Sequence, residues 1–437
     1  MLVSFSIENI LSFKDTQTLR MDAVSHGKDD INSINWIAVA EGSKERLLKS
    51  ALIFGANASG KSNYIRSISL FRNIMLRSQA ALEEESYPIK QLTPFLLTKK
   101  SIQQPSIMEV VFYESGIRYR YGLEIKGEKI QAEWLFYTPK TRETQLFIRE
   151  GETIEFNKEG FSEAASLVKN GKIQHTRDNV PFISVLATHN GMHASNVIRW
   201  VNRLAIISGA EEHGYMNFTI ELMKKDPDFK LWLLDILQVF QIENLEVVEV
   251  EAPIVNLKIA DEHAELQELL TSFNRFSKKR KAQKLLVTKK AFSEDGDFNI
   301  DFPLDFESDG TKKLIHLLGP IYDSIKNKRI LIIDEVEAKF HTLLTRHLFQ
   351  IYHQKNTTGS QIIAAAHDTS LMDTRYFRRD QIWFINKNAQ GSSEIYSLVE
   401  FKEKARQLKQ EYGSDYLAGA FGAISLFESI RQIEEVM

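Results

Sequence analysis

The sequence predicts an α/β fold with an antiparallel β subdomain and a helical insertion. An apolar run at 52–54 leads into a glycine-rich loop and then a helical pattern, and a second helical pattern separates apolar runs at 330–333 and 361–366. Strands that alternate with helices in this way are typical of a parallel sheet. Residues 105–151 instead show β-branched and aromatic alternation between short turns, which predicts an antiparallel sheet.

The composition is that of an ordinary globular protein and excludes several kinds of chemistry. The 437 residues, 43% hydrophobic and 26% charged, suggest two or three domain-sized units. The net charge of −3 gives no general argument for nucleic-acid binding, so any such contact must be local. The lack of cysteine excludes disulfides, thiol catalysis and cysteine-bound metal clusters. Without a signal-peptide pattern or a run of about 18 apolar residues, we expect a soluble cytoplasmic protein with no membrane contact.

A phosphate-binding loop is predicted by Gly55-x-x-x-x-Gly60-Lys61-Ser62, which follows an apolar strand. Its glycines allow the backbone to turn tightly and direct N–H groups at an anion. In such a loop Lys61 reaches the terminal phosphates and the Ser62 hydroxyl completes a Mg²⁺ shell. An accidental glycine turn is the alternative, but the helical spacing over 64–75 would direct a helix N-terminus at the phosphates. The residues expected to bind the nucleotide here are Gly55, Ala56, Asn57, Ala58, Ser59, Gly60, Lys61, Ser62 and Asn63.

Polar side chains follow the two later apolar strands at their carboxyl ends, where ligands of α/β sheets bind. Asp334 can hold Mg²⁺ there, and Glu335, which points differently, can take a proton from an attacking water as a general base. The alternative is an acid pair that caps the following helix. His367 ends the next strand and can sense or polarise a γ-phosphate, although a lone histidine is more often structural.

One stretch of the predicted insertion is strongly basic. Between Arg275 and Lys290 there are eight Lys or Arg residues and no acid. An exposed, solvated ridge explains this pattern as well as a local contact with an anion or a nucleic acid does. The sequence leaves both interpretations open.

The motifs, in their order along the chain, resemble the ABC-type ATPases of the SMC, RecF and OLD branch. More narrowly, they resemble the stand-alone OLD-like "AAA15" group of bacterial ATPases. The motifs that carry the resemblance are Gly55–Ser62, Ser308-Asp309-Gly310-Thr311, Asp334-Glu335, Ala338-Lys339-Phe340-His341 and His367, with supporting signatures at 307–313, 379–382 and 416–422. We expect neither the long coiled coil of SMC relatives nor the Toprim nuclease domain of true OLD proteins.

The resemblance implies a role for each motif. Ser308, Asp309, Gly310 and Thr311 would form the signature loop, which contacts the γ-phosphate held by the opposite subunit. Asp334 would be the metal residue, Glu335 the catalytic base, 338–341 the D-loop at a dimer interface, and His367 the switch histidine. Residues 9–13 match a segment near the base or ribose. The family's metal-contacting glutamine has no clear counterpart, since Gln91 and Gln174 both fit poorly.

The resemblance also implies an architecture and an activity. Residues 1–160 and 295–437 would form an ABC-type (P-loop) ATPase head, with 161–294 as a helical lid or arm. ATP and water would give ADP and phosphate, with Mg²⁺, at composite sites of a homodimer or higher homo-oligomer. Such proteins often act in bacterial phage defence beside a separate nuclease or toxin effector. The alternatives are a DNA-repair or DNA-end ATPase, which would use 275–290, and a nucleotide-gated scaffold with little turnover.

Overall fold

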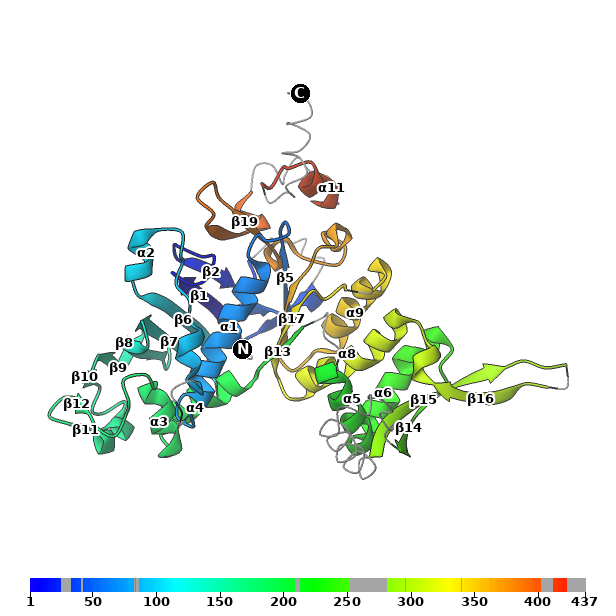
Figure 1. Ribbon diagram of the computed structural model, residues 1–437, viewed down its shortest axis with the longest axis horizontal. Coiled ribbons are helices and arrows are strands. Elements are labelled where there is room, and N and C mark those ends of the chain that lie inside the picture. The colour runs from blue at the N-terminus through cyan, green and yellow to red at the C-terminus, as the bar shows by residue number, and fades with distance from the viewer. Residues whose placement is uncertain are drawn as a thin grey trace, which may run out of the picture. The chain divides into compact units, whose positions relative to one another are not determined.

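The structure is a computed structural model, and Figure 1 shows its elements. It describes residues 1–24, 33–40, 42–81, 83, 86–208, 213–251, 281–294, 296–338, 340–401 and 412–422. The chain forms two compact units, one of Met1–Glu211 with Asp323–Met437 and one of Glu212–Tyr322. These bounds differ from the expected domain boundaries after 160 and 294. Among the described residues, no helix is both long and apolar enough to cross a membrane.

The first unit contains a six-stranded sheet that holds the predicted phosphate loop. Its order is β13-β17-β18-β5-β19-β20, and all neighbours are parallel except β19 and β20, which form an antiparallel hairpin. The carboxyl ends of the parallel strands therefore meet at one edge, as the sequence predicts. The strands are β5 (Ser50–Phe54), β13 (Leu204–Ser208), β17 (Ile330–Asp334), β18 (Gln361–Ala365), β19 (Ile382–Lys387) and β20 (Ser393–Ser397).

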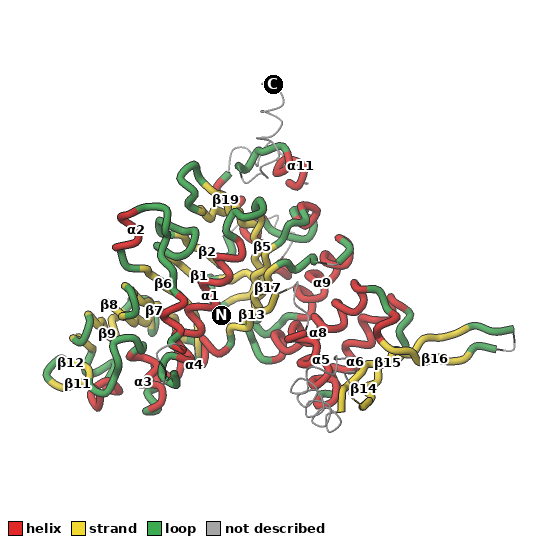
Figure 2. The backbone as a smooth tube through the Cα atoms, viewed as in Figure 1, coloured by secondary structure: helices red, strands yellow, loops and turns green. Residues whose placement is uncertain are grey.

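A nine-stranded antiparallel sheet forms the second layer of this unit, and it includes the antiparallel strands predicted over 105–151 (Figure 2). Its order is β11-β12-β10-β9-β8-β7-β6-β1-β2. The strands are β1 (Leu2–Glu8), β2 (Gln17–Arg20), β6 (Ser106–Glu114), β7 (Ile117–Lys126), β8 (Lys129–Thr138), β9 (Thr144–Glu150), β10 (Thr153–Phe156), β11 (Val168–Lys169) and β12 (Lys172–Ile173). A separate antiparallel pair consists of β3 (Trp36–Ala38) and β4 (Arg46–Leu48).

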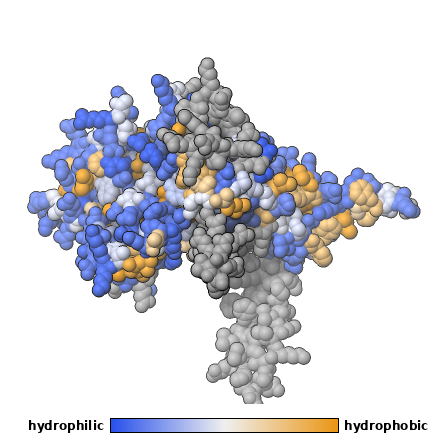
Figure 3. All heavy atoms as spheres, turned by 90° about the horizontal axis from the view of Figure 1, so that it is seen from above, coloured by the Kyte–Doolittle hydropathy of each residue, from blue (hydrophilic) through white to orange (hydrophobic). Residues whose placement is uncertain are grey.

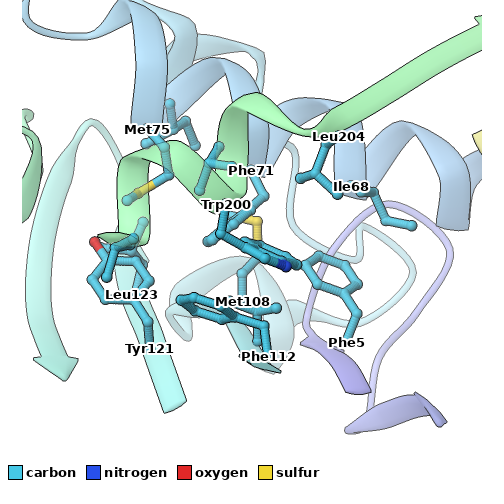
Figure 4. Close-up of a cluster of buried hydrophobic side chains, with 14 of the residues drawn as sticks. Phe5, Ile68, Phe71, Met75, Met108, Phe112, Tyr121, Leu123, Trp200 and Leu204 are labelled. Carbon is cyan, nitrogen blue, oxygen red and sulfur yellow. The ribbon is translucent and has the colours of Figure 1, made fainter. Parts of the chain in front are cut away.

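Helix α1 (Lys61–Arg77) follows the phosphate loop and shares one hydrophobic core with both sheets. Figure 4 shows this core, in which Trp200 stacks on Phe112 with ring centroids 4.3 Å apart. Trp200 belongs to α4 (Met192–Asn202), which follows α3 (Phe182–Thr188). Because these helices bury their apolar faces in the first unit, residues 161–211 belong with the head rather than with the predicted insertion. The other helices of this unit are α2 (Lys99–Gln103), α9 (Thr342–Lys355) and α11 (Tyr412–Leu417).

The second unit combines helices with a three-stranded antiparallel sheet. Helices α5 (His213–Lys225) and α6 (Pro227–Leu237) agree with the expected helical character, and α8 (Asp309–Lys326) runs into the first unit. The sheet, of order β14-β15-β16, consists of β14 (Asn244–Glu251), β15 (Lys281–Ala291) and β16 (Phe298–Pro303). Apolar residues are exposed along the β15–β16 hairpin, among them Phe292 and Phe298 at 77% and 53% exposure (Figure 3).

Candidate functional site

The phosphate loop is shaped by close contacts with the β19–β20 hairpin. A Cβ atom added to Gly55 would lie 2.2 Å from the backbone oxygen of Ile385, which is closer than any real Cβ approaches. Gly60 has a φ of 122°, and a Cβ there would lie 2.4 Å from the Oγ of Ser393. Both glycines are therefore required by the packing as well as by the turn.

Lys61 lies inside this loop as a buried cation. Its Nζ donates hydrogen bonds to the carbonyl oxygens of Gly55 at 2.7 Å and Ala56 at 3.0 Å. Burial lowers the pKa of Lys61 to about 8, although the carboxylates of Asp334, Glu337 and Glu335 act in the opposite direction. The loop and the carboxyl end of β17 are thus close enough to interact electrostatically, although about 270 residues separate them in the sequence.

Helix α1 begins at Lys61 and presents its N-terminus at the loop. Gly60 occupies the N-cap position, and among the described residues no side chain caps the helix there. The first N–H groups of the helix thus stay available to an anion. Ser62 is exposed, whereas the amide of Asn63 donates to Ser12 Oγ at 3.0 Å and so connects the helix to the N-terminal segment.

Asp334 provides a carboxylate suited to a metal ion. It ends β17, and its Oδ1 is buried without a hydrogen-bond partner among the residues that the structure describes. Mg²⁺ takes one or two protein ligands and completes its shell with phosphate oxygens and water. Asp334 and Ser62 are the residues here that fit such an ion.

Glu335 is exposed and sits in an unusual backbone conformation. Its φ is 54°, in the left-handed region that a glutamate rarely adopts. Such strain is concentrated at functional sites and costs about 1–3 kcal/mol. The change of direction after β17 sets Glu335 apart from Asp334, and the exposed carboxylate can reach a water molecule.

His367 follows β18 and belongs to the same group of charges. Burial lowers its pKa, the charge of Lys61 lowers it further, and Glu335 and Asp334 act in the opposite direction. Its backbone N–H donates to the carboxylate of Glu337. The neutral imidazole is therefore favoured near neutral pH. Glu337 was not predicted as a site residue, although its place three residues after Asp334 could have indicated it.

The motifs known only from the resemblance have mainly local contacts. Ser308 Oγ accepts a hydrogen bond from the N–H of Thr311 at 3.1 Å and so caps the start of α8 in the second unit. The Asn9 amide donates to three carbonyl groups at 101–105, and Asn9 is buried, so it holds the fold together. In the D-loop, His341 caps α9, and Lys339 lies outside the described residues.

Two lysines of the basic stretch form ion pairs with acids in the part that the structure describes. Residues 275–280 lie outside the described residues, and 281–290 belong to β15. Lys289 forms an ion pair with Glu307 at 2.7 Å, and Lys290 with Asp297 at 2.8 Å. Strand β14 pairs with β15 along its length, and the backbone register sets Glu249 opposite Gln283 and Glu246 opposite Leu286. The two ion pairs favour the solvated-surface interpretation, and the nucleic-acid contact stays a prediction.

Comparison with known proteins identifies the family. Residues 50–373 match the family described as "AAA domain, putative AbiEii toxin, Type IV TA system". The chain belongs to this family. The match contains the phosphate loop, the acids after β17 and His367, so the predicted α/β P-loop fold is confirmed. The narrower OLD-like group stays a prediction. A search of curated proteins found no match.

Three solved structures are similar to the chain at low sequence identity. The SMC head domain from Thermotoga maritima is 14% identical, with a TM-score of 0.41 over 91% of this chain and 98% of its own. An SMC head bound to the C-terminal winged-helix domain of ScpA is 12% identical, with a TM-score of 0.46 over 91% and 97%. An SMC head with an extended coiled coil, bound to the C-terminal domain of ScpA derived from Pyrococcus furiosus, is 11% identical, with a TM-score of 0.39 over 93% and 98%.

Proposed function

We propose that this protein binds ATP with Mg²⁺ and hydrolyses it to ADP and phosphate. The observation that carries the proposal is one electrostatic cluster drawn from three strand ends. Lys61 after β5 interacts with Asp334 and Glu335 after β17, and His367 after β18 interacts with all three. A buried cation in a glycine-rich loop suits a phosphate group. Of the two acids, one can bind the metal ion while the other acts as the general base.

Each residue has a separate task in this mechanism. The Lys61 ammonium and the free N–H groups of α1 would hold the terminal phosphates in place. Ser62 Oγ and Asp334 Oδ1 would hold Mg²⁺, which neutralises charge on the phosphate oxygens. The exposed carboxylate of Glu335 would accept the proton of the attacking water. Neutral His367 would donate a hydrogen bond to the γ-phosphate as its charge shifts.

The test is the Glu335→Gln variant. The amide keeps the shape and loses the base, so phosphate release should fall by about 10²–10⁴-fold while ATP binding by calorimetry is kept. A matched control is Glu152→Gln, which alters an acid with an 82% exposed side chain in the turn between β9 and β10 and should leave turnover unchanged. Wild-type turnover in Glu335→Gln would mean that another group activates the water. Bound ATP with no turnover in the wild type would instead favour the nucleotide-gated scaffold.

The proposal extends to a site completed by a second copy of the chain. The resemblance assigns Ser308, Asp309, Gly310 and Thr311 to the other subunit's ATP, and the start of α8 offers small residues and helix N–H groups that suit a phosphate. Ser308→Arg should then bind ATP but lose ATP-dependent dimerisation by light scattering. Mixing it with Lys61→Ala should restore some hydrolysis, because a mixed dimer keeps one site without a lesion. Normal turnover by monomeric Ser308→Arg would contradict this arrangement.

For the biological role, we propose a regulatory ATPase of bacterial phage defence, of the OLD-like group, that acts with a separate nuclease or toxin effector. The resemblance supports this role, and so does the family description, which names a toxin and a toxin–antitoxin system. Affinity purification with the product of the neighbouring gene, with and without ATP, tests it. A chain that binds DNA ends and no such partner would favour the DNA-repair alternative.

A further inference from the structure

The β19–β20 hairpin contacts the phosphate loop at Gly55 and Gly60, the two glycines of its motif. Ile385 on β19 lies against Gly55, and Ser393 at the start of β20 lies against Gly60. The hairpin is itself held from another direction, because Phe384 stacks on Tyr416 and Tyr396 donates its hydroxyl to the backbone oxygen of Phe421 at 2.6 Å. The loop therefore rests on a fixed support whose residues lie more than 300 positions later in the chain.

Ser393 makes the most direct polar contact between this support and the loop. Its Oγ lies 2.5 Å from the carbonyl oxygen of Ser59 and 2.8 Å from Ser12 Oγ, and its N–H donates to the carbonyl of Ser12 at 2.7 Å. Ser393 is fully buried. Since Ser12 Oγ also accepts from the amide of Asn63 on α1, the three segments that meet at the loop are joined by one hydrogen-bond network.

The bond to Ser59 fixes the direction of a loop N–H group. A peptide group is planar and trans, so its C=O and N–H point in opposite directions. With the Ser59 carbonyl held toward Ser393, the N–H of Gly60 in the same peptide group points away from Ser393. That N–H directly precedes Lys61, in the part of the loop expected to surround the phosphates.

We propose that Ser393 is a positioning residue for phosphate binding, which orients the Gly60 N–H by holding the Ser59 carbonyl. This inference rests on the proposed ATP binding. Ser393 acts through the loop backbone, so its loss should weaken affinity for the phosphates more than it slows the chemical step. Ser12 shares the network and should belong to the same functional unit.

The experiment measures ATP affinity and turnover for Ser393→Ala with Mg²⁺. We expect the Kd for ATP and the KM to rise about five- to tenfold, in line with one lost hydrogen bond, while kcat stays within about twofold. Ser397→Ala is the matched control, because the Ser397 Oγ bonds to Ile382 at the start of β19 and to Val399 just after β20 rather than to the loop, and the Kd should not change. Ser12→Ala should give a similar rise, and the double variant should show less than the sum of both effects.

Two outcomes would overturn the inference while leaving ATP binding intact. One is an unchanged Kd in both Ser393→Ala and Ser12→Ala, measured beside a Lys61→Ala variant that no longer binds. The other is a rise in Kd that Ser397→Ala reproduces, which would indicate a general loosening of the hairpin. Absence of ATP binding by the wild type would contradict the proposed function itself, and the inference would fall with it.

Discussion

The phosphate loop and the basic strand β15 are both conspicuous in the sequence, but their residues make different kinds of contact in the structure. In the loop, Gly55 and Gly60 each meet a specific neighbour, and buried Lys61 donates hydrogen bonds to the carbonyl groups of Gly55 and Ala56. On β15, Lys289 and Lys290 each pair with an acid from a neighbouring segment and stay partly exposed. A motif with fixed spacing predicts a binding site well, because the loop needs a particular residue at each motif position. A run of basic residues predicts a binding site poorly, because acids from neighbouring segments can neutralise it.

Among the variants of these two regions, Gly60→Ala is expected to have the largest effect on stability and on ATP binding. The φ of 122° and the 2.4 Å approach to Ser393 Oγ should together cost about 1–3 kcal/mol of unfolding free energy, and ATP binding should be lost. Gly116→Ala is the matched control, because Gly116 also has a positive φ, of 77°, but no atom lies near its added Cβ. Gly116→Ala should lower the free energy of unfolding, measured by urea denaturation, by less than Gly60→Ala does, and it should leave ATP binding unchanged. An equal loss of unfolding free energy in the two variants would show that the hairpin does not shape the loop.

An intermediate effect concerns the protonation of Lys61. Its pKa of about 8 in the free protein means that the amine is charged below this pH and neutral above it. Bound phosphates favour the charged form, so ATP binding near pH 8 should take up about half a proton, and affinity should fall as the pH rises further. Calorimetry in two buffers of different ionisation enthalpy measures the uptake. Identical binding heats in the two buffers at pH 8 would contradict the buried environment of Lys61.

The smallest effect is expected on β15. Removing both cations with Lys289→Ala and Lys290→Ala should change the free energy of unfolding by about 1 kcal/mol or less, because the pairs with Glu307 and Asp297 are partly exposed. ATP affinity should not change. A clear loss of DNA binding in this variant, measured at fixed salt concentration, would support a nucleic-acid contact by β15.

The site residues at the carboxyl ends of strands could be predicted from the sequence, because the patterns that indicate strands, turns and helices are local. Lys61 and His367 follow β5 and β18, Asp334 is the last residue of β17, and a parallel sheet brings such strand ends to one edge. Contacts made by distant segments could not be predicted in this way. Ser393 reaches Ser59 only because the hairpin lies beside β5, and nothing in the local pattern near 393 indicates this.

The extent of the insertion was hard to predict for a similar reason. The helices at 182–202 read as part of a helical region, yet Trp200 packs in the core of the first unit. In strand β15, which lies in the stretch described as basic, Leu285 and Val287 alternate with other residues and are buried. In both cases tertiary packing decided what the local pattern left open.

The most direct test of the account is calorimetric titration of ATP with Mg²⁺ into the wild type and into Lys61→Ala. We predict saturable binding by the wild type and none by Lys61→Ala, because the variant loses the buried cation that would face the phosphates. Thermal unfolding of the two proteins in the absence of nucleotide shows whether the variant is folded. Equal ATP affinity in the two folded proteins would contradict the assignment of this loop as the nucleotide site.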